Sequence, residues 1–204
     1  MNLKEKYKKE YYTQNENRAD SDVIDAVRQH PNALSMYRYS EFIYGDIIDV
    51  GSNLSATTLI AAESDTVISA LGVDLNQTSV DRFNKIKEYA KNGAKEKTSM
   101  LVANVLELDA YLEENTFDAL LTYHMLEHLY PEDLNLAIIQ MKRVLKPGGY
   151  LIISIPWERC LGSPNHITFW NDVTLKRLFE THAFKTHECY RADPRHLTGA
   201  FLKE

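Results

Sequence analysis

Four side chains in the second half of the chain could take part in proton transfer or metal binding. They are His124, Glu127, His128 and His166. Histidine titrates near neutral pH and can act as a general base, whereas imidazoles with a carboxylate can hold a transition metal. A third interpretation is that these residues only order the loops that contain them. We favour His124 and His166 as catalytic residues and expect no bound metal.

A glycine turn in the segment 46–55 could bring the backbone close to a ligand. The segment, DIIDVGSNLS, begins with a β-branched run that predicts a strand buried on both faces. Gly51 permits a tight turn, and Asn53 and Ser55 are suitable N-cap residues for a helix over 56–62. A strand, a turn and a helix N-terminus at the carboxyl edge of a parallel sheet form a typical cofactor site.

The rest of the chain alternates between strands and helices. Strands are predicted at 46–50, 67–74, 100–104, 116–123 and 150–155, and helices at 56–62, 77–90, 131–146 and 173–181. This alternation predicts a parallel sheet with helices on both faces. Two further strands, 183–190 and 196–202, are joined by a connection so short that they must form an antiparallel hairpin.

The composition is that of an ordinary globular protein. The 204 residues carry a formal net charge of −6, which opposes non-specific binding to nucleic acid. No apolar run approaches the length of a membrane span, and the start of the chain lacks the apolar stretch of a signal peptide. Cys160 and Cys189 form no CxxC motif and are expected to be free thiols, so we expect a cytoplasmic protein.

Residues 1–45 precede the sheet, and we expect them to form an N-terminal helical cap on a domain that spans 46–204. Helices are predicted at 4–12, 21–29 and 33–43. This region is rich in tyrosine, and its tyrosines either face a substrate or pack against the sheet. They are Tyr7, Tyr11, Tyr12, Tyr37, Tyr39 and Tyr44.

Five sequence blocks occur in an order that is typical of one enzyme family. They are Asp49-Val50-Gly51, Gly72-Val73-Asp74, Phe117-Asp118, Leu126-Glu127-His128-Leu129 and Arg143-Val144-Leu145-Lys146-Pro147-Gly148-Gly149. Over 46–204 the chain resembles the class I S-adenosylmethionine-dependent methyltransferases, and among them those that act on small molecules. The resemblance implies an α/β, Rossmann-like, doubly wound sheet of seven strands, mostly parallel, with a C-terminal antiparallel hairpin.

The first loop departs from the family pattern acid-x-Gly-x-Gly-x-Gly, since Asn53 and Ser55 replace the second and third glycines. Asparagine tolerates the left-handed backbone that such a turn requires. The single glycine also disfavours an NAD-dependent oxidoreductase, which requires G-x-G-x-x-G more strictly. A catalytically inactive methyltransferase fold, kept as a binding or partner module, remains an alternative.

The resemblance implies a site for S-adenosylmethionine at the ends of the first four strands. The residues assigned to it are Asp49, Gly51, Asn53, Asp74, Leu75, Asn104, Val105 and Tyr123. Asp49 and Gly51 would line the methionine part, and Tyr123 would offer its backbone carbonyl to the ammonium group. Asp74 would accept hydrogen bonds from both ribose hydroxyls. Leu75 would pack on the adenine, whose amino group would donate to the side-chain carbonyl of Asn104.

The block from His124 to His128 is also similar to the Glu-x-x-Glu-His metal motif of small-RNA 2′-O-methyltransferases. His124 takes the place of the first glutamate, and His166 could supply a later ligand. His166 lies in a long loop after the fifth strand, and such loops are usually functional. Three aromatic residues could wall a pocket there or pack the loop: Trp157, Phe169 and Trp170. Three other histidines are expected to lie on the hairpin side, away from the chemistry: His182, His187 and His196.

The implied activity is methyl transfer to a small-molecule or glycan-like acceptor, most simply at oxygen. A nucleic-acid acceptor is disfavoured because the chain is acidic and has no basic stripe. The chain also lacks the Asn/Asp-Pro-Pro-aromatic block that follows the fourth strand in enzymes that methylate the amino groups of bases. Thr122-Tyr123-His124-Met125 occupies that position.

Overall fold

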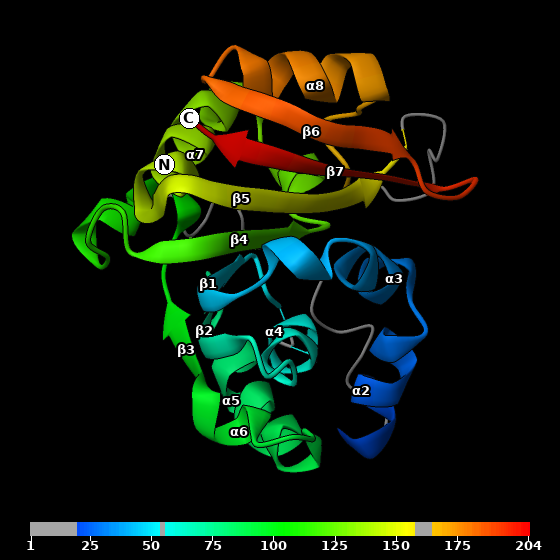
Figure 1. The fold of residues 1–204 in the computed structure, drawn as a ribbon, viewed down its shortest axis with the longest axis vertical. Coiled ribbons are helices and arrows are strands. Elements are labelled where there is room, and N and C mark those ends of the chain that lie inside the picture. Colours follow the sequence, from blue (N-terminus) through cyan, green and yellow to red (C-terminus); the bar gives the residue numbers. More distant parts are fainter. Residues whose placement is uncertain (1–19, 54–55, 158–164) are drawn as a thin grey trace.

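The computed structural model describes residues 20–53, 56–157 and 165–204. Seven strands within these residues form one sheet in the order β3-β2-β1-β4-β5-β7-β6 (Figure 1). β1 to β5 are parallel, and β7 pairs antiparallel with both β5 and β6. This confirms the predicted parallel sheet with a terminal hairpin. The strands are β1 (Gly45–Val50), β2 (Val67–Asp74), β3 (Thr98–Val102), β4 (Phe117–Tyr123), β5 (Leu145–Pro156), β6 (Phe184–Arg191) and β7 (His196–Lys203).

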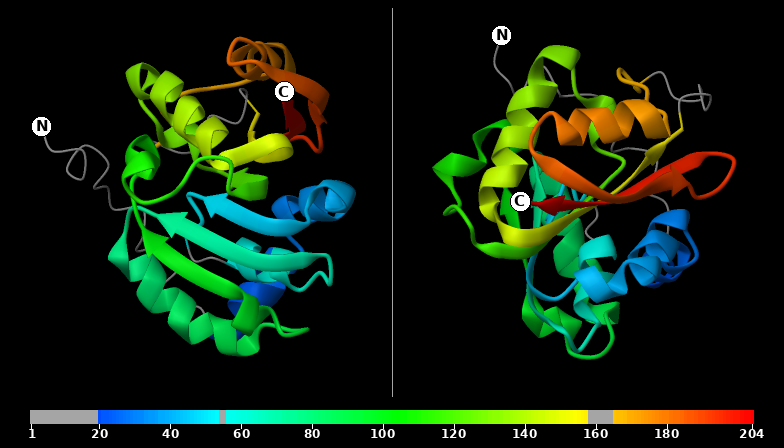
Figure 2. Two further views of the ribbon diagram at one scale, coloured as in Figure 1. Left: turned by 60° about the vertical axis from the view of Figure 1, so that its left-hand side comes forward. Right: turned by 45° about the horizontal axis from the view of Figure 1, so that its top comes forward.

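Helices cover both faces of the sheet, as two further views show (Figure 2). One face carries α2 (Asp20–Arg28), α3 (Pro31–Arg38), α4 (Ala56–Ala62), α5 (Gln77–Ile86) and α6 (Ala94–Lys97). The other carries η4 (Val105–Ala110), α7 (Pro131–Val144) and α8 (Asp172–Glu180). The consecutive residues Ile47 and Ile48 of β1 are both fully buried, one in each core, because side chains alternate along a strand. Among the described residues, no helix is both long and apolar enough to cross a bilayer.

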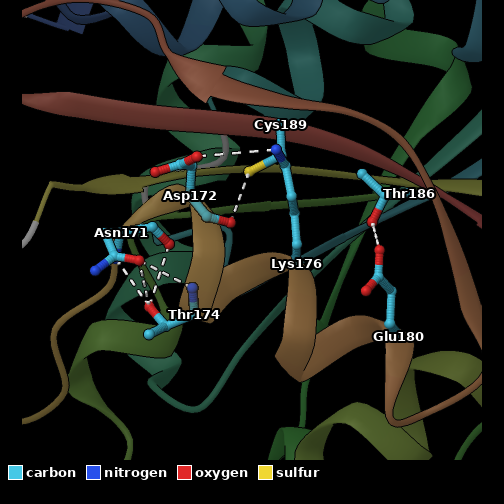
Figure 3. A network of polar contacts seen from close by, with 7 residues as sticks. All are labelled: Asn171, Asp172, Thr174, Lys176, Glu180, Thr186 and Cys189. Carbon is cyan, nitrogen blue, oxygen red and sulfur yellow. Dashed lines mark hydrogen bonds and ion pairs between the residues drawn. The ribbon is translucent and has the colours of Figure 1, made fainter.

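The helix α8 is joined to β6 by polar contacts (Figure 3). Asn171 and Thr174 form a capping box at its N-terminus. The thiol of Cys189 donates to the carbonyl oxygen of Asp172 over 4.0 Å. The hydroxyl of Thr186 donates to Oε1 of Glu180, at the end of α8, over 2.7 Å. Burial raises the pKa of Cys189 to about 12. Cys189 is a buried free thiol, as predicted, whereas Cys160 lies outside the described residues.

Several elements differ from their predicted boundaries. β3, predicted at 100–104, spans Thr98–Val102. The helix predicted at 33–43 ends at Arg38, because Tyr39 (φ −101°, ψ 20°) leaves the helical region, and a short 3₁₀ turn, η2 (Ser40–Phe42), follows. β5 begins at Leu145 instead of Tyr150, since Leu145 already pairs with Phe117 before the register shifts. The intervening Pro-Gly-Gly segment forms this irregularity. The helix predicted at 4–12 lies outside the described residues.

The helices α5 and α7 are shorter than predicted. α5 ends at Ile86, and the 3₁₀ turn η3 (Lys87–Tyr89) completes the segment predicted as helix to residue 90. α7 ends at Val144 because β5 starts at the next residue. These earlier C-terminal ends do not change which face of the sheet α5 and α7 cover, so the layers of the fold are those predicted.

The N-terminal helix α3 is fastened to the C-terminal hairpin by a buried hydrogen-bond chain. The hydroxyls of Ser35 and Thr198 lie 2.5 Å apart, and Thr198 donates to the carbonyl oxygen of Ile153 over 2.8 Å. Ser35 is 4% exposed and Thr198 is fully buried. Buried hydroxyls are stabilising only when they are paired. These two hydrogen bonds therefore hold α3 over β7 and β5.

We predict that Thr198→Val, which keeps the shape and removes the hydroxyl, lowers the free energy of unfolding by about 1–3 kcal/mol, since it leaves two buried polar groups without this partner. Urea denaturation measures the change. The double variant Ser35→Ala/Thr198→Val should lose less than the sum of the two single variants, because the interaction is already absent. Strictly additive losses would show that the two hydroxyls do not interact.

Candidate active site at the carboxyl edge of the sheet

Asp49 is a buried carboxylate near the end of β1. Its side chain is 1% exposed, and Oδ2 accepts hydrogen bonds from the hydroxyls of Thr57 (2.6 Å) and Thr58 (2.8 Å) on α4. Oδ1 has no partner among the described residues. Burial raises the pKa of Asp49 to about 6, although the two threonine hydroxyls oppose the rise. A ligand with a positive charge or a hydrogen-bond donor would stabilise this oxygen.

Asp74, at the end of β2, connects the loops that follow β1 and β2. Its Oδ2 accepts from the backbone N–H of Asn53 and its Oδ1 from that of Asn76, each over 2.9 Å. Asn53 takes a left-handed φ of 46°, at a position where the family has glycine. Gly51 also has a positive φ (77°), and a Cβ there would lie 2.4 Å from Cγ of Met125. The tight turn is therefore formed with asparagine at its second glycine position, while Ser55 lies outside the described residues.

Asn104 follows β3 and is the N-cap of η4. Its Oδ1 accepts from the backbone N–H of Leu106 over 3.0 Å, so the side-chain carbonyl assigned to adenine already has one partner. Its Nδ2 is buried and has no partner in the part of the chain that the structure describes. The amide thus offers a buried donor beside the backbone of Val105.

The predicted cofactor residues share one edge of the sheet. Asp49 of β1 lies opposite Gly72 of β2 on one side and Leu121 of β4 on the other. Tyr123, the last residue of β4, is buried, and burial together with the charge of Asp49 raises the pKa of its hydroxyl. Leu75 directly follows β2 at the same edge. The carboxyl ends of the parallel strands lie at one edge of the sheet, and the strand order reverses between β1 and β4. This point on the edge is the expected place for a ligand.

Glu127 joins the loop after β4 to the loop after β5. Its side chain is buried, and Oε1 lies 3.1 Å from Nδ1 of His124. Its backbone carbonyl accepts from the N–H groups of Ile167 (2.7 Å) and Thr168 (3.1 Å). Burial alone would raise the pKa of Glu127, but the hydrogen bond from His124 and the proximity of His128 hold it below its usual value. The interpretation that Glu127 orders the loops fits these bonds.

His128 and His166 lie together next to Glu127. Nδ1 of His128 is 3.0 Å from the carbonyl oxygen of Asn165, and the two histidine rings are 5.3 Å apart. Nδ1 of His166 is buried and has no partner within the described ranges. Burial lowers the pKa of His166, and the neighbouring histidines lower it further, against the effect of Glu127. His166 is thus mainly neutral at pH 7 and able to accept a proton.

Two further histidines lie beside His124. The ring of His124 is 5.3 Å from that of His196 and 5.8 Å from that of His30, and His30 and His196 are 5.5 Å apart. The prediction that His196 lies away from the chemistry is wrong, because β7 runs antiparallel to β5 and therefore starts at the carboxyl edge. The hairpin topology could have located His196 in advance. His30 lies in the turn between α2 and α3, and no motif in the sequence marks it.

The predicted aromatic residues do not share one environment. Trp170 is buried in the core with α8, whereas Phe169 is 45% exposed and Trp157 packs under the guanidinium of Arg191. Among the tyrosines of the N-terminal region, Tyr39 is buried, and Tyr37 and Tyr44 are exposed. The other three lie outside the described residues: Tyr7, Tyr11 and Tyr12.

We predict that Asp49→Asn changes the pH dependence of stability. The folded-state pKa of Asp49 is raised, so the native protein takes up this proton below about pH 6 and is stabilised relative to the unfolded chain. Between pH 7.5 and pH 5 the wild type should therefore gain about 1 kcal/mol that the variant does not gain. Denaturant unfolding at both pH values measures the difference. Parallel changes in the two proteins would exclude a raised pKa.

A family model described as a methyltransferase domain matches residues 48–153, slightly more than half of the chain. A probable methyltransferase, ltbC, of Aspergillus luteorubrus is 32% identical to the chain over 108 residues. An uncharacterised methyltransferase of Schizosaccharomyces pombe, C1B3.06c, is 30% identical over the same length. Each match covers 52% of this chain but only 38% and 37% of the relatives, so the chain spans well under half of their length.

Solved structures share the fold over most of the chain. The PH0226 protein of Pyrococcus horikoshii has a TM-score of 0.74 and 17% identity, over 96% of this chain and 99% of that protein. A SAM-dependent methyltransferase from Aquifex aeolicus has a TM-score of 0.68 and 16% identity, over 92% and 100% of the two chains. These identities are low, so the likeness shows the fold alone.

The sheet order and the family match lead to the same assignment. The match runs from β1 to β5, which carry the polar residues at the carboxyl edge. It excludes the alternative that the chain is an NAD-dependent oxidoreductase. S-adenosylmethionine is the cofactor of this family. The chain therefore belongs to the methyltransferase-domain family of class I S-adenosylmethionine-dependent methyltransferases.

Proposed function

We propose that this protein transfers a methyl group from S-adenosylmethionine to a small-molecule or glycan-like acceptor, at oxygen. The observation that carries the proposal is a pair of buried polar atoms at the carboxyl edge, Oδ1 of Asp49 and Nδ2 of Asn104. Neither has a partner within the described residues. Buried polar atoms of this kind call for a ligand, and S-adenosylmethionine has both a cationic end and a base with acceptor atoms.

The residues present fit the cofactor. Asp49, next to the end of β4, would hold the ammonium of the methionine part, and the backbone carbonyl of Tyr123 would accept from it. The carboxylate of Asp74 would accept from the ribose hydroxyls while it keeps the two loops in place. Nδ2 of Asn104 would donate to the base, beside the backbone of Val105 and the side chain of Leu75. When bound, the cofactor supplies an electrophilic methyl group on a sulfonium.

The protein's own part in the reaction is mainly to position the acceptor and to exclude water. An acceptor hydroxyl must also lose its proton, and His166 is the better placed general base, because its pKa is lowered and Nδ1 is buried without a partner in the described chain. His124 is already hydrogen-bonded to Glu127 and faces two other histidines. The catalytic role of His124 therefore stays a prediction, and its contacts with the other two histidines allow a different role.

The acceptor class is inferred from charge and family. The net charge of −6 does not favour nucleic acid, and the residues that follow β4 are not those of base-methylating relatives.

The cytoplasmic location and the division into a cap over 1–45 and a domain over 46–204 remain predictions. His30, between α2 and α3, lies beside His124, so these two helices would form one wall of the acceptor site.

We predict that the wild type binds S-adenosylmethionine with micromolar affinity. Asp74→Ala should lose about 1.5–3 kcal/mol of binding free energy, which is roughly a 10- to 150-fold weaker affinity. Isothermal titration calorimetry measures it. Asp81→Ala is the matched control, since it removes an exposed carboxylate from nearby α5. Because Asp74 also holds two loops, unfolding of each variant should be measured alongside. Unchanged affinity in Asp74→Ala would refute the ribose assignment, and no binding to the wild type would leave the partner-module alternative.

We predict that the imidazole of His166 titrates below pH 6.5, because burial lowers its pKa. NMR titration of the histidine Cε1–H resonances measures the midpoint, and His166→Gln identifies the resonance by its disappearance. Glu127 raises the pKa of His166, so Glu127→Gln should move the midpoint to still lower pH. A midpoint above 6.5 in the wild type would rule out the buried neutral base.

A further inference from the structure

Three histidines from distant parts of the chain meet at the carboxyl edge of the sheet. His30 comes from the turn between α2 and α3, His124 follows β4, and His196 begins β7. One possible ligand nitrogen from each lies within 4.8 Å of the others. The nitrogens of three imidazoles on one tetrahedral zinc ion are roughly 3.4 Å apart, so small side-chain rotations would bring them into coordination.

Two of these imidazoles are oriented by carboxylates. Nδ1 of His124 lies 3.1 Å from Oε1 of Glu127, and Nδ1 of His196 lies 2.8 Å from Oδ2 of Asp193. A carboxylate beside Nδ1 holds the proton on that nitrogen and leaves the lone pair on Nε2. Carboxylate–histidine–metal arrangements in proteins have this form. The pattern therefore prepares both Nε2 atoms as metal ligands.

The Nε2 atom of His124 supplies a second, independent observation. It is buried and has no partner among the residues that the structure describes, although a buried nitrogen without a partner is destabilising. His124 is also held in a left-handed backbone conformation (φ 53°), which is uncommon for a residue other than glycine. Strained backbone of this kind clusters at functional sites.

The backbone around the other two histidines is fixed as well. The carbonyl oxygen of His30 accepts from Ala33 over 2.9 Å, and its N–H donates to the carbonyl of Val27 over 3.0 Å. The N–H of His196 donates to Oδ1 of Asp193 over 2.9 Å. Each imidazole is thus presented by a defined turn or strand end, as a preorganised site requires.

We propose that His30, His124 and His196 form a binding site for a divalent transition metal, with zinc as the preferred ion. Three imidazoles favour zinc, copper or nickel over magnesium, and three protein ligands leave a fourth position open. The carboxylates of Glu127 and Asp193 lie next to the ligands and balance the charge of a dication. Because His124 follows β4, the open position is on the acceptor side of the edge, a placement that rests on the proposed function.

A second group of possible ligands lies nearby, and the test must separate the two. Glu127, His128 and His166 also bring their ligand atoms within 4.8 Å of one another. His166→Ala removes a ligand only from that group, whereas His30→Ala and His196→Ala remove ligands only from the three-histidine site. His30 lies in an exposed turn, so His30→Ala is the substitution least able to disturb folding.

The experiment is titration of the full chain with Zn²⁺ in the absence of cofactor, by calorimetry, together with the visible spectrum of the Co²⁺ form. We expect one Zn²⁺ per chain with micromolar or tighter affinity, a tetrahedral Co²⁺ spectrum, and at least 100-fold weaker binding in His30→Ala and His196→Ala. Asp193→Asn should weaken binding about 10- to 100-fold by releasing His196. His166→Ala and the exposed control His187→Ala should bind as the wild type does.

Wild-type affinity in His30→Ala, or zinc binding lost in His166→Ala alone, would overturn the three-histidine site. Absence of zinc binding to the wild type would overturn it equally. Circular dichroism of each variant shows that it is folded. Because no cofactor is present, these outcomes are independent of whether S-adenosylmethionine binds, and titration of the same variants with the cofactor tests the proposed function separately.

Discussion

The arrangement around His124 and His166 depends on one buried carboxylate. Glu127 is 1% exposed, its side chain bonds to His124, and its backbone carbonyl accepts from Ile167 and Thr168. A charge in such a position is tolerated only if it is paired. The pairing fixes the ring of His124 and brings the loop after β5 against the loop after β4, so that His166 is placed by the same residue.

Asp74, at the end of β2, has a corresponding role. A single carboxylate accepts from Asn53 and Asn76 and so ties together the turns after β1 and β2. This explains how a first loop with one glycine keeps its form: the left-handed turn needs a residue that tolerates positive φ, and the bond from its N–H to Asp74 fixes it there. At position 53 the missing glycine is replaced by an asparagine whose backbone N–H is held by Asp74.

Most of the fold follows from patterns local in the sequence. Apolar runs such as that of β1 and the helical spacing of α5 identify their elements, and the short connection between β6 and β7 dictates their pairing. What local patterns could not show is the pairing of Leu145 with Phe117, which extends β5 through a Pro-Gly-Gly segment. That pairing depends on a neighbouring strand and not on propensity.

The site was predictable to the extent that it follows strand ends. Asp49, Asp74 and the residues after β4 could be placed together because parallel strands align their carboxyl ends. His30 could not, since it reaches the site only through the packing of α2 and α3 on α4. Asn104 lies just after the end of β3, and the bond from Leu106 that occupies its carbonyl arises from a cap that only the three-dimensional course of the chain reveals.

The order of the chain separates the two proposed binding sites. The stretch 48–153 that matches the family contains Asp49, Asp74 and Asn104, whereas His30 precedes it and His196 follows it. Recombination that exchanges the flanking segments between related genes would therefore alter the surroundings of His124 and leave the proposed cofactor residues untouched. New acceptor preferences could arise by segment exchange instead of by stepwise substitution within the shared core of the enzyme.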